Sequence, residues 1–108
     1  MTALSAQDRA IRDRLAARVT PELVAEHGAA PFGPHSPALQ EVLDFLRRNP
    51  APDLPRYVVL DLGGSFAVAA RTARGLPPEP VDAERHADEA AAEHAVFLRR
   101  LADYGLLP

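Results

Sequence analysis

The sequence predicts a small α+β domain in which N-terminal helices precede an antiparallel hairpin, one further strand and a C-terminal helix packed on the sheet. Apolar residues follow a helical period in 37–48 and again in 89–104. Between these segments, two β-prone runs, RYVVLDL and SFAVAART, meet at Gly63-Gly64, a pair suited to a two-residue hairpin turn. A chain of 108 residues suffices for one core, so we expect 1–108 to form a single domain, with 1–18 most prone to fraying.

Two short helices are expected at the N-terminus. SAQDRAIRDRLAAR (5–18) places Ile11 and Leu15 on one face, and Ser5 is a suitable cap. Thr20 followed by Pro21 begins a second helix, TPELVAEHG, which we expect Gly28 to close. The following segment, AAPFGPHSP, is rich in proline and reads as an ordered loop whose one aromatic residue needs burial in the core or against a partner.

The next helix is defined at both ends. Ser36 caps it, Pro37 occupies its first position, and Asn49-Pro50 stops it. Its core stripe at i, i+3, i+4 and i+7 comprises Leu39, Val42, Leu43 and Leu46.

If Gly63-Gly64 forms the hairpin turn, the register of the two strands follows. Asp61 then faces Phe66, Val59 faces Val68, and Tyr57 faces Ala70. The opposite face carries Val58, Leu60, Leu62, Ala67 and Ala69, so both faces are largely apolar and we expect both to be covered. We expect ARGLPPEPVD to be a loop and a third strand to run through 84–87.

The last helix is expected from Glu89 to about Tyr104, with Asp88 as its cap and Gly105 as its stop. Arg99 can pair with Asp103 one turn later. The residues assigned to its apolar side are Ala90, Ala91, His94, Phe97, Leu98, Leu101 and Tyr104.

Composition excludes several classes of protein. The net charge of -3 and the absence of basic blocks longer than two residues disfavour nucleic-acid binding. No run approaches the roughly 20 apolar residues of a membrane span, and no signal peptide is visible. With no cysteine there is no disulfide framework and no thiolate site, which is typical of a cytoplasmic protein.

The residues that could carry chemistry form no distinctive motif. The four histidines show neither i, i+4 ligand spacing nor HExxH, so we expect no metal site and no cofactor in this chain. No GxSxG elbow or phosphate-binding glycine motif occurs, and we expect no catalytic residues. For His94, a buried imidazole that is hydrogen-bonded to backbone or to an acid is favoured over a chemical role.

Three blocks of sequence carry a resemblance to a known family. They are an HxxxPFG-like stretch ending at Gly33, an HSPxLQ-like run in 35–40, and HAVFLRR in 94–100, the most specific of the three. Over 21–103 the chain resembles the small (alpha) subunit of N,N-dimethylformamidase. The match departs at 86–88, where the family carries an aromatic residue and a Thr or Ser cap, and in the hairpin, which is less aromatic and less charged here.

The resemblance implies a non-catalytic accessory subunit in a hetero-oligomer. Its large partner subunit would hold a mononuclear iron and hydrolyse the C–N bond of small formamides, while the small chain binds and stabilises it. Only structural or contact roles transfer to this chain, and the residues expected to fill them are Phe32, His35, His94, Phe97, Arg99 and Arg100.

More specific expectations accompany these roles. His94, Phe97, Leu98 and Leu101 should pack the last helix onto the sheet, with Arg99 and Arg100 at the margin of that face. Changing Arg100 to Ala should weaken partner capture and leave the domain folded. Two alternatives stay open: a stand-alone interaction or regulatory module with another partner, and an independent small enzyme using His94 or His35.

Overall fold

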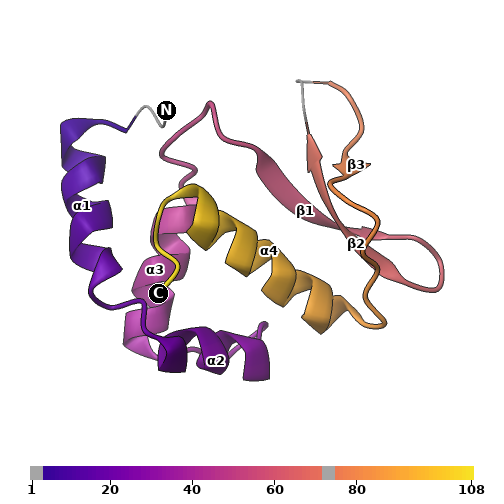
Figure 1. Cartoon of the computed structure of the whole chain (residues 1–108), viewed down its shortest axis with the longest axis horizontal. Helices are drawn as coiled ribbons and strands as arrows, with labels where there is room; N and C mark the ends of the chain where they lie inside the picture. Colours follow the sequence, from indigo (N-terminus) through magenta and orange to yellow (C-terminus); the bar gives the residue numbers. More distant parts are fainter. Residues whose placement is uncertain (1–3, 72–74) are drawn as a thin grey trace.

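The fold is described from a computed structural model, which covers residues 4–71 and 75–108. The described residues form four helices and three strands, in the order α1 (Ala6–Ala16), α2 (Pro21–Ala29), α3 (Pro37–Arg47), β1 (Arg56–Asp61), β2 (Phe66–Arg71), β3 (Glu79–Pro80) and α4 (Glu89–Asp103). Figure 1 shows the first three helices at one end of the molecule and the sheet at the other, with α4 running between them. The predicted α+β class is confirmed.

The predicted helix starts are confirmed by their caps. In each helix, a side-chain oxygen of the residue before the first turn accepts a hydrogen bond from a backbone amide within that turn. These caps are Ser5, Thr20, Ser36 and Asp88, and the amides belong to Asp8, Leu23, Leu39 and Ala91, respectively. The stop of α4 is also as expected, because Gly105 has a positive φ of 68° and the Leu106 amide bonds to the Leu101 carbonyl.

The prediction that Gly28 closes α2 is wrong, because the helix continues through it to Ala29. Gly28 instead lies against α4: a Cβ at this position would lie 3.2 Å from two atoms of the His94 ring, which would have to shift slightly to accept it. The glycine therefore allows α2 and α4 to approach closely.

The three strands form an antiparallel sheet in the order β1-β2-β3, and the predicted hairpin register is confirmed at every pair from Tyr57–Ala70 to Asp61–Phe66. The third strand lies elsewhere than expected. The ladder with β2 is made by Glu79–Pro80, within the segment expected to be a loop, and His86 contributes only an isolated bridge to Phe66. Proline is tolerated there because the strand is at an edge of the sheet.

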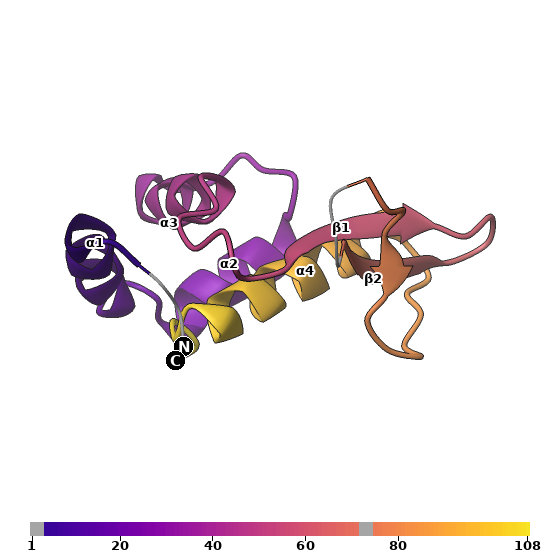
Figure 2. The same ribbon diagram turned by 90° about the horizontal axis from the view of Figure 1, so that it is seen from above.

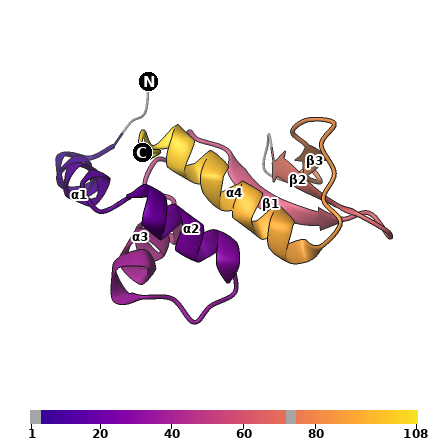
Figure 3. The same ribbon diagram turned by 60° about the horizontal axis from the view of Figure 1, so that its bottom comes forward.

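The core divides around α4, which Figures 2 and 3 show lying beside both α2 and the sheet. Val96 packs against Tyr57 and Val68 on the sheet, whereas Phe97 and Leu101 join the core formed with the other helices. The expectation that His94, Phe97, Leu98 and Leu101 face the sheet is therefore wrong for Phe97 and Leu101, and also for His94, whose ring packs against α2. The stripe assigned to α4 also included Ala91, which is exposed, and omitted Ala92 and Val96, which are buried.

The expectation that both faces of the hairpin are covered is confirmed for the face against α4 and only in part for the opposite face, where Val58 and Leu60 are partly buried. Tyr57, Val68 and Ala70 are buried on the face that α4 covers. On the opposite face Ala67 and Ala69 are fully buried, although Leu62 beyond the end of β1 stays 44% exposed.

The N-terminal helix is anchored rather than peripheral. Leu15 of α1 is fully buried in the main core, and Ile11 packs against it. Within the part of the chain that the structure describes, no helix is long and apolar enough to span a membrane.

Candidate functional site

Helix α2, the loop that follows it and the distant helix α4 meet at a group of aromatic rings. We define the histidine cluster as His27 of α2, His35 of the following loop, and His94 and Phe97 of α4. His27 is at its centre: its side chain is 2% exposed, and the Phe97 ring stacks on it with centroids 4.0 Å apart. Three of the predicted contact residues, His35, His94 and Phe97, therefore surround a histidine that was not among them.

His27 and His94 are joined directly, with 2.9 Å between their Nδ1 atoms. One Nδ1 must donate and the other accept, so two neutral rings in opposite tautomers satisfy this hydrogen bond. The expected partner of His94 was a backbone group or an acid, and the structure places another imidazole there. Gly28 makes room for the ring of His94, as described above.

His35 connects the cluster to the loop between α2 and α3. Its ring stacks against His27 at 6.0 Å between centroids, and its Nε2 lies 3.2 Å from the Pro31 carbonyl oxygen, to which it can donate. The end of the loop is fixed by Glu26, whose carboxylate accepts hydrogen bonds from the backbone amide and the hydroxyl of Ser36, both at 2.7 Å. The loop is ordered as predicted.

The side chain of Phe32 projects from this loop and is 63% exposed. Of the two positions expected for it, the core is therefore wrong. A large aromatic side chain held outward on an ordered loop is suited to contact with another molecule.

The electrostatic environment keeps the histidine pair neutral. Burial, followed by the neighbouring His94 and His35, lowers the pKa of His27 to about 4, against a weaker opposing effect of Glu26. Burial also lowers the pKa of His94, while the hydrogen bonds from Ser36 lower the pKa of Glu26. Among the described residues, no group of three or more His, Cys, Asp or Glu side chains is arranged to hold a metal ion. This geometry suits packing and precise positioning of the loop.

The two arginines of the HAVFLRR block point in different directions. Arg99 pairs with Asp82 in the segment after β3, so the predicted pairing with Asp103 is wrong. Asp103 instead accepts a hydrogen bond from the Tyr57 hydroxyl at 2.7 Å. Since β1 and the loop before α4 flank this part of the helix, tertiary contacts replace the expected pairing along it.

We expect a double-mutant cycle between Arg99→Gln and Asp82→Asn to give a coupling of about 0.2 to 1 kcal/mol, as for other exposed pairs. The matched cycle between Arg99→Gln and Asp103→Asn should give a smaller coupling. Urea unfolding of the three single variants, the two double variants and the wild type measures both. A larger coupling with Asp103 would restore the helical pairing predicted from the sequence.

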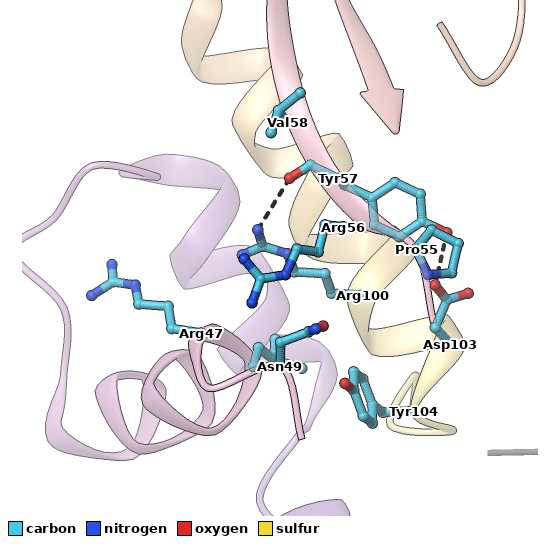
Figure 4. A pocket seen from close by; sticks show the side chains of 10 residues that line it. Arg47, Asn49, Pro55, Arg56, Tyr57, Val58, Arg100, Asp103 and Tyr104 are labelled. Atoms are coloured by element: carbon cyan, nitrogen blue, oxygen red, sulfur yellow. Dashed lines mark hydrogen bonds between the residues drawn. The ribbon is translucent and has the colours of Figure 1, made fainter. Parts of the chain in front are cut away.

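Arg100 lies in a pocket of about 210 Å³ between the end of α3, β1 and α4. It is half-buried and donates through Nη2 to the Tyr57 carbonyl at 3.2 Å, on the outer edge of the sheet. In Figure 4, the Arg56 guanidinium lies beside that of Arg100, and Arg47 extends from the end of α3 at the pocket's edge. We call this the arginine pocket, defined by Arg47, Arg56 and Arg100.

Sequence reasoning missed His27, Arg47 and Arg56. A signal was present for His27, which follows Leu23 by four residues and so shares the buried face of its helix. Arg47 and Arg56 carry no such signal, because the pocket forms only when the end of α3 meets the edge of the sheet.

Comparison with known proteins shows which family this chain is similar to. The family described as "N,N-dimethylformamidase alpha subunit" matches residues 2–107. A curated relative, the N,N-dimethylformamidase alpha subunit of an Alcaligenes species, is 41% identical over 88 residues. This alignment covers 77% of the present chain and 64% of the relative, so the chain spans less than two thirds of the relative's length.

Proposed function

Because this chain belongs to the N,N-dimethylformamidase alpha-subunit family, we propose that it is the small accessory subunit of an amide hydrolase. In this proposal it binds and stabilises a large subunit, which holds a mononuclear iron and hydrolyses the C–N bond of a small formamide. The complex would be cytoplasmic, in keeping with a chain that has no cysteine. The family membership is the principal support for the proposal.

The histidine cluster gives this role a structural basis. The three sequence blocks that carry the resemblance meet there, through His27, His35 and His94. Their rings are used to join α2, α4 and the loop, and His27 is too enclosed to meet a substrate. This packing fixes the loop, which exposes Phe32 to solvent. An exposed aromatic side chain on a fixed loop is suited to binding another subunit.

We expect Phe32→Ala to weaken the complex with the large subunit by about 30-fold or more, the range of an aromatic hot spot. Stability of the isolated chain should change little, because the ring is already 63% exposed. Surface-immobilised chain titrated with the large subunit measures the affinity. Leu62→Ala, at an exposed apolar residue of the hairpin, is the matched control; an unchanged affinity for Phe32→Ala would remove Phe32 from the interface.

The division of labour can be tested with separately purified subunits. The small chain alone should contain no iron and should not hydrolyse N,N-dimethylformamide, whereas a stoichiometric mixture with the large subunit should. Iron is measured by elemental analysis, and hydrolysis by release of dimethylamine. Hydrolysis by the small chain alone would contradict an accessory role and return attention to its own histidines.

A further inference from the structure

The arginine pocket brings the positive charges of Arg47, Arg56 and Arg100 close together. Within 4–71 and 75–108, none of its three arginines pairs with a carboxylate, although five other arginines do. Arg56 also lies directly across the hairpin from Arg71, an arrangement of like charges that destabilises a strand pair. The chain as a whole is acidic, with a net charge of -3, so this concentration is local.

Arg100 is the more buried of the two guanidinium groups that lie side by side in the pocket. It is half-buried, and among the described residues the one hydrogen bond of its side chain is to a neutral carbonyl oxygen. Burial lowers the pKa of Arg100 against the opposing effects of Glu93 and Tyr104, and Arg47 and Arg56 contribute smaller effects in the lowering direction. A guanidinium nevertheless stays charged at every physiological pH, so a bound anion would offset the repulsion among these groups.

The shape and lining of the pocket restrict which anion fits. At about 210 Å³ it is smaller than pockets that take drug-sized ligands, and much larger than the space of one water. Leu46, Pro55 and Val58 line it beside the guanidinium groups, which favours an anion that carries carbon. The acidic Asp103 also lines it and disfavours a doubly charged phosphate.

We propose that the arginine pocket binds a carboxylate, held by the paired guanidinium groups of Arg56 and Arg100, with the alkyl part of the ligand against the apolar wall. A planar carboxylate matches the fork of a guanidinium and accepts two parallel hydrogen bonds from it. The carboxylate can come from an acidic side chain of a bound protein or from a small free acid. The site itself does not depend on the function proposed above.

The test uses the isolated chain and sodium propionate, which reproduces the end of a glutamate side chain. At constant ionic strength, propionate should shift the Nε–H signal of Arg100 and the amide signal of Val58 saturably in NMR spectra, and sodium chloride should not. Phosphate should bind more weakly than propionate. Shifts with propionate no larger than with chloride would overturn the proposal.

Arg56→Gln and Arg100→Gln should each weaken propionate binding by at least about tenfold. Arg56 is exposed and makes no side-chain hydrogen bond within the described residues, so its loss should not unfold the chain and keeps the test valid if Arg100→Gln is unstable. Arg85→Gln is the matched control, because it removes the same charge from a loop outside the pocket. Unchanged binding by Arg56→Gln would overturn the proposed site.

A second arm identifies the source of the carboxylate. If a partner protein supplies it, Arg56→Gln should weaken the complex with that partner and propionate should compete with the partner for the wild-type chain. If the ligand is a free acid, neither Arg56→Gln nor propionate should change the affinity of the complex. Failure of the wild-type chain to bind any large subunit would count against the proposed function alone, because propionate binding is measured without a partner.

Discussion

Phe97→Ala is expected to lower the free energy of unfolding by about 3 to 5 kcal/mol. The ring is 3% exposed, belongs to the main core and stacks on His27, so its loss opens a cavity in contact with a buried polar group. A domain of this size has a free energy of unfolding of about 5 to 15 kcal/mol. The Phe97→Ala change therefore removes a large part of the total stability. Urea unfolding followed by circular dichroism measures the change.

The matched control is Phe32→Ala, which removes the same side chain from an exposed position and should change stability by less than about 0.5 kcal/mol. Equal stability of Phe97→Ala and the wild type would mean that Phe97 does not close the core. The histidine cluster would then lose its structural role.

Acidification from pH 6.5 to about pH 4 is expected to destabilise the chain through His27. Above pH 6.5 the ring is neutral in both folded and unfolded states and imposes no cost. Between the ordinary pKa of 6.5 and the folded value of about 4, the unfolded state takes up a proton that the folded state does not. Each pH unit in this window costs about 1.4 kcal/mol, or roughly 3 kcal/mol over the whole of it.

The range from pH 6.5 to 5 is the diagnostic one, because carboxylates titrate mostly below it. His27→Asn removes the titration and keeps a group able to hydrogen-bond His94, so the pH dependence of its unfolding should be flatter there. The His27 ring can also be titrated by NMR in the wild-type chain. A His27 pKa near 6.5, or an equal pH dependence in His27→Asn, would contradict the neutral pair.

Local signals were sufficient to predict the helices and the hairpin. Capping residues and proline positions act within a few residues of the chain, so Ser36 followed by Pro37 fixed the start of α3 without reference to the rest of the fold. The Gly63-Gly64 turn likewise determined the hairpin register, because a two-residue loop leaves one alignment of the strands.

Features that depend on tertiary contacts were not predictable. Gly28 has the properties of a helix stop, yet it lies within α2, where its missing side chain leaves space for the ring of His94. Asp103 has the right spacing to pair with Arg99. In the structure, however, Asp103 accepts a hydrogen bond from Tyr57, and Arg99 pairs with Asp82. The position of the third strand was predicted wrongly because an edge strand needs only an extended backbone to pair, so its sequence carries little signal.

The candidate site shows the same division. The sequence identified His94 and Phe97 as residues of an apolar face, and the structure adds the histidine that joins them to α2. Arg100 was expected at the margin of a packed face, and the structure places it half-buried at such a margin. The pocket that it shares with Arg56, however, is formed by elements that are far apart in the chain.

The central claim is that this chain works as one subunit of a larger enzyme. The most direct test is affinity capture of the tagged chain from its native cells, with the co-purifying proteins identified by mass spectrometry and the mass of the complex measured. We predict a large formamidase-like subunit in stoichiometric amount. Recovery of the chain alone, monomeric and stable, would contradict the claim and favour a stand-alone module.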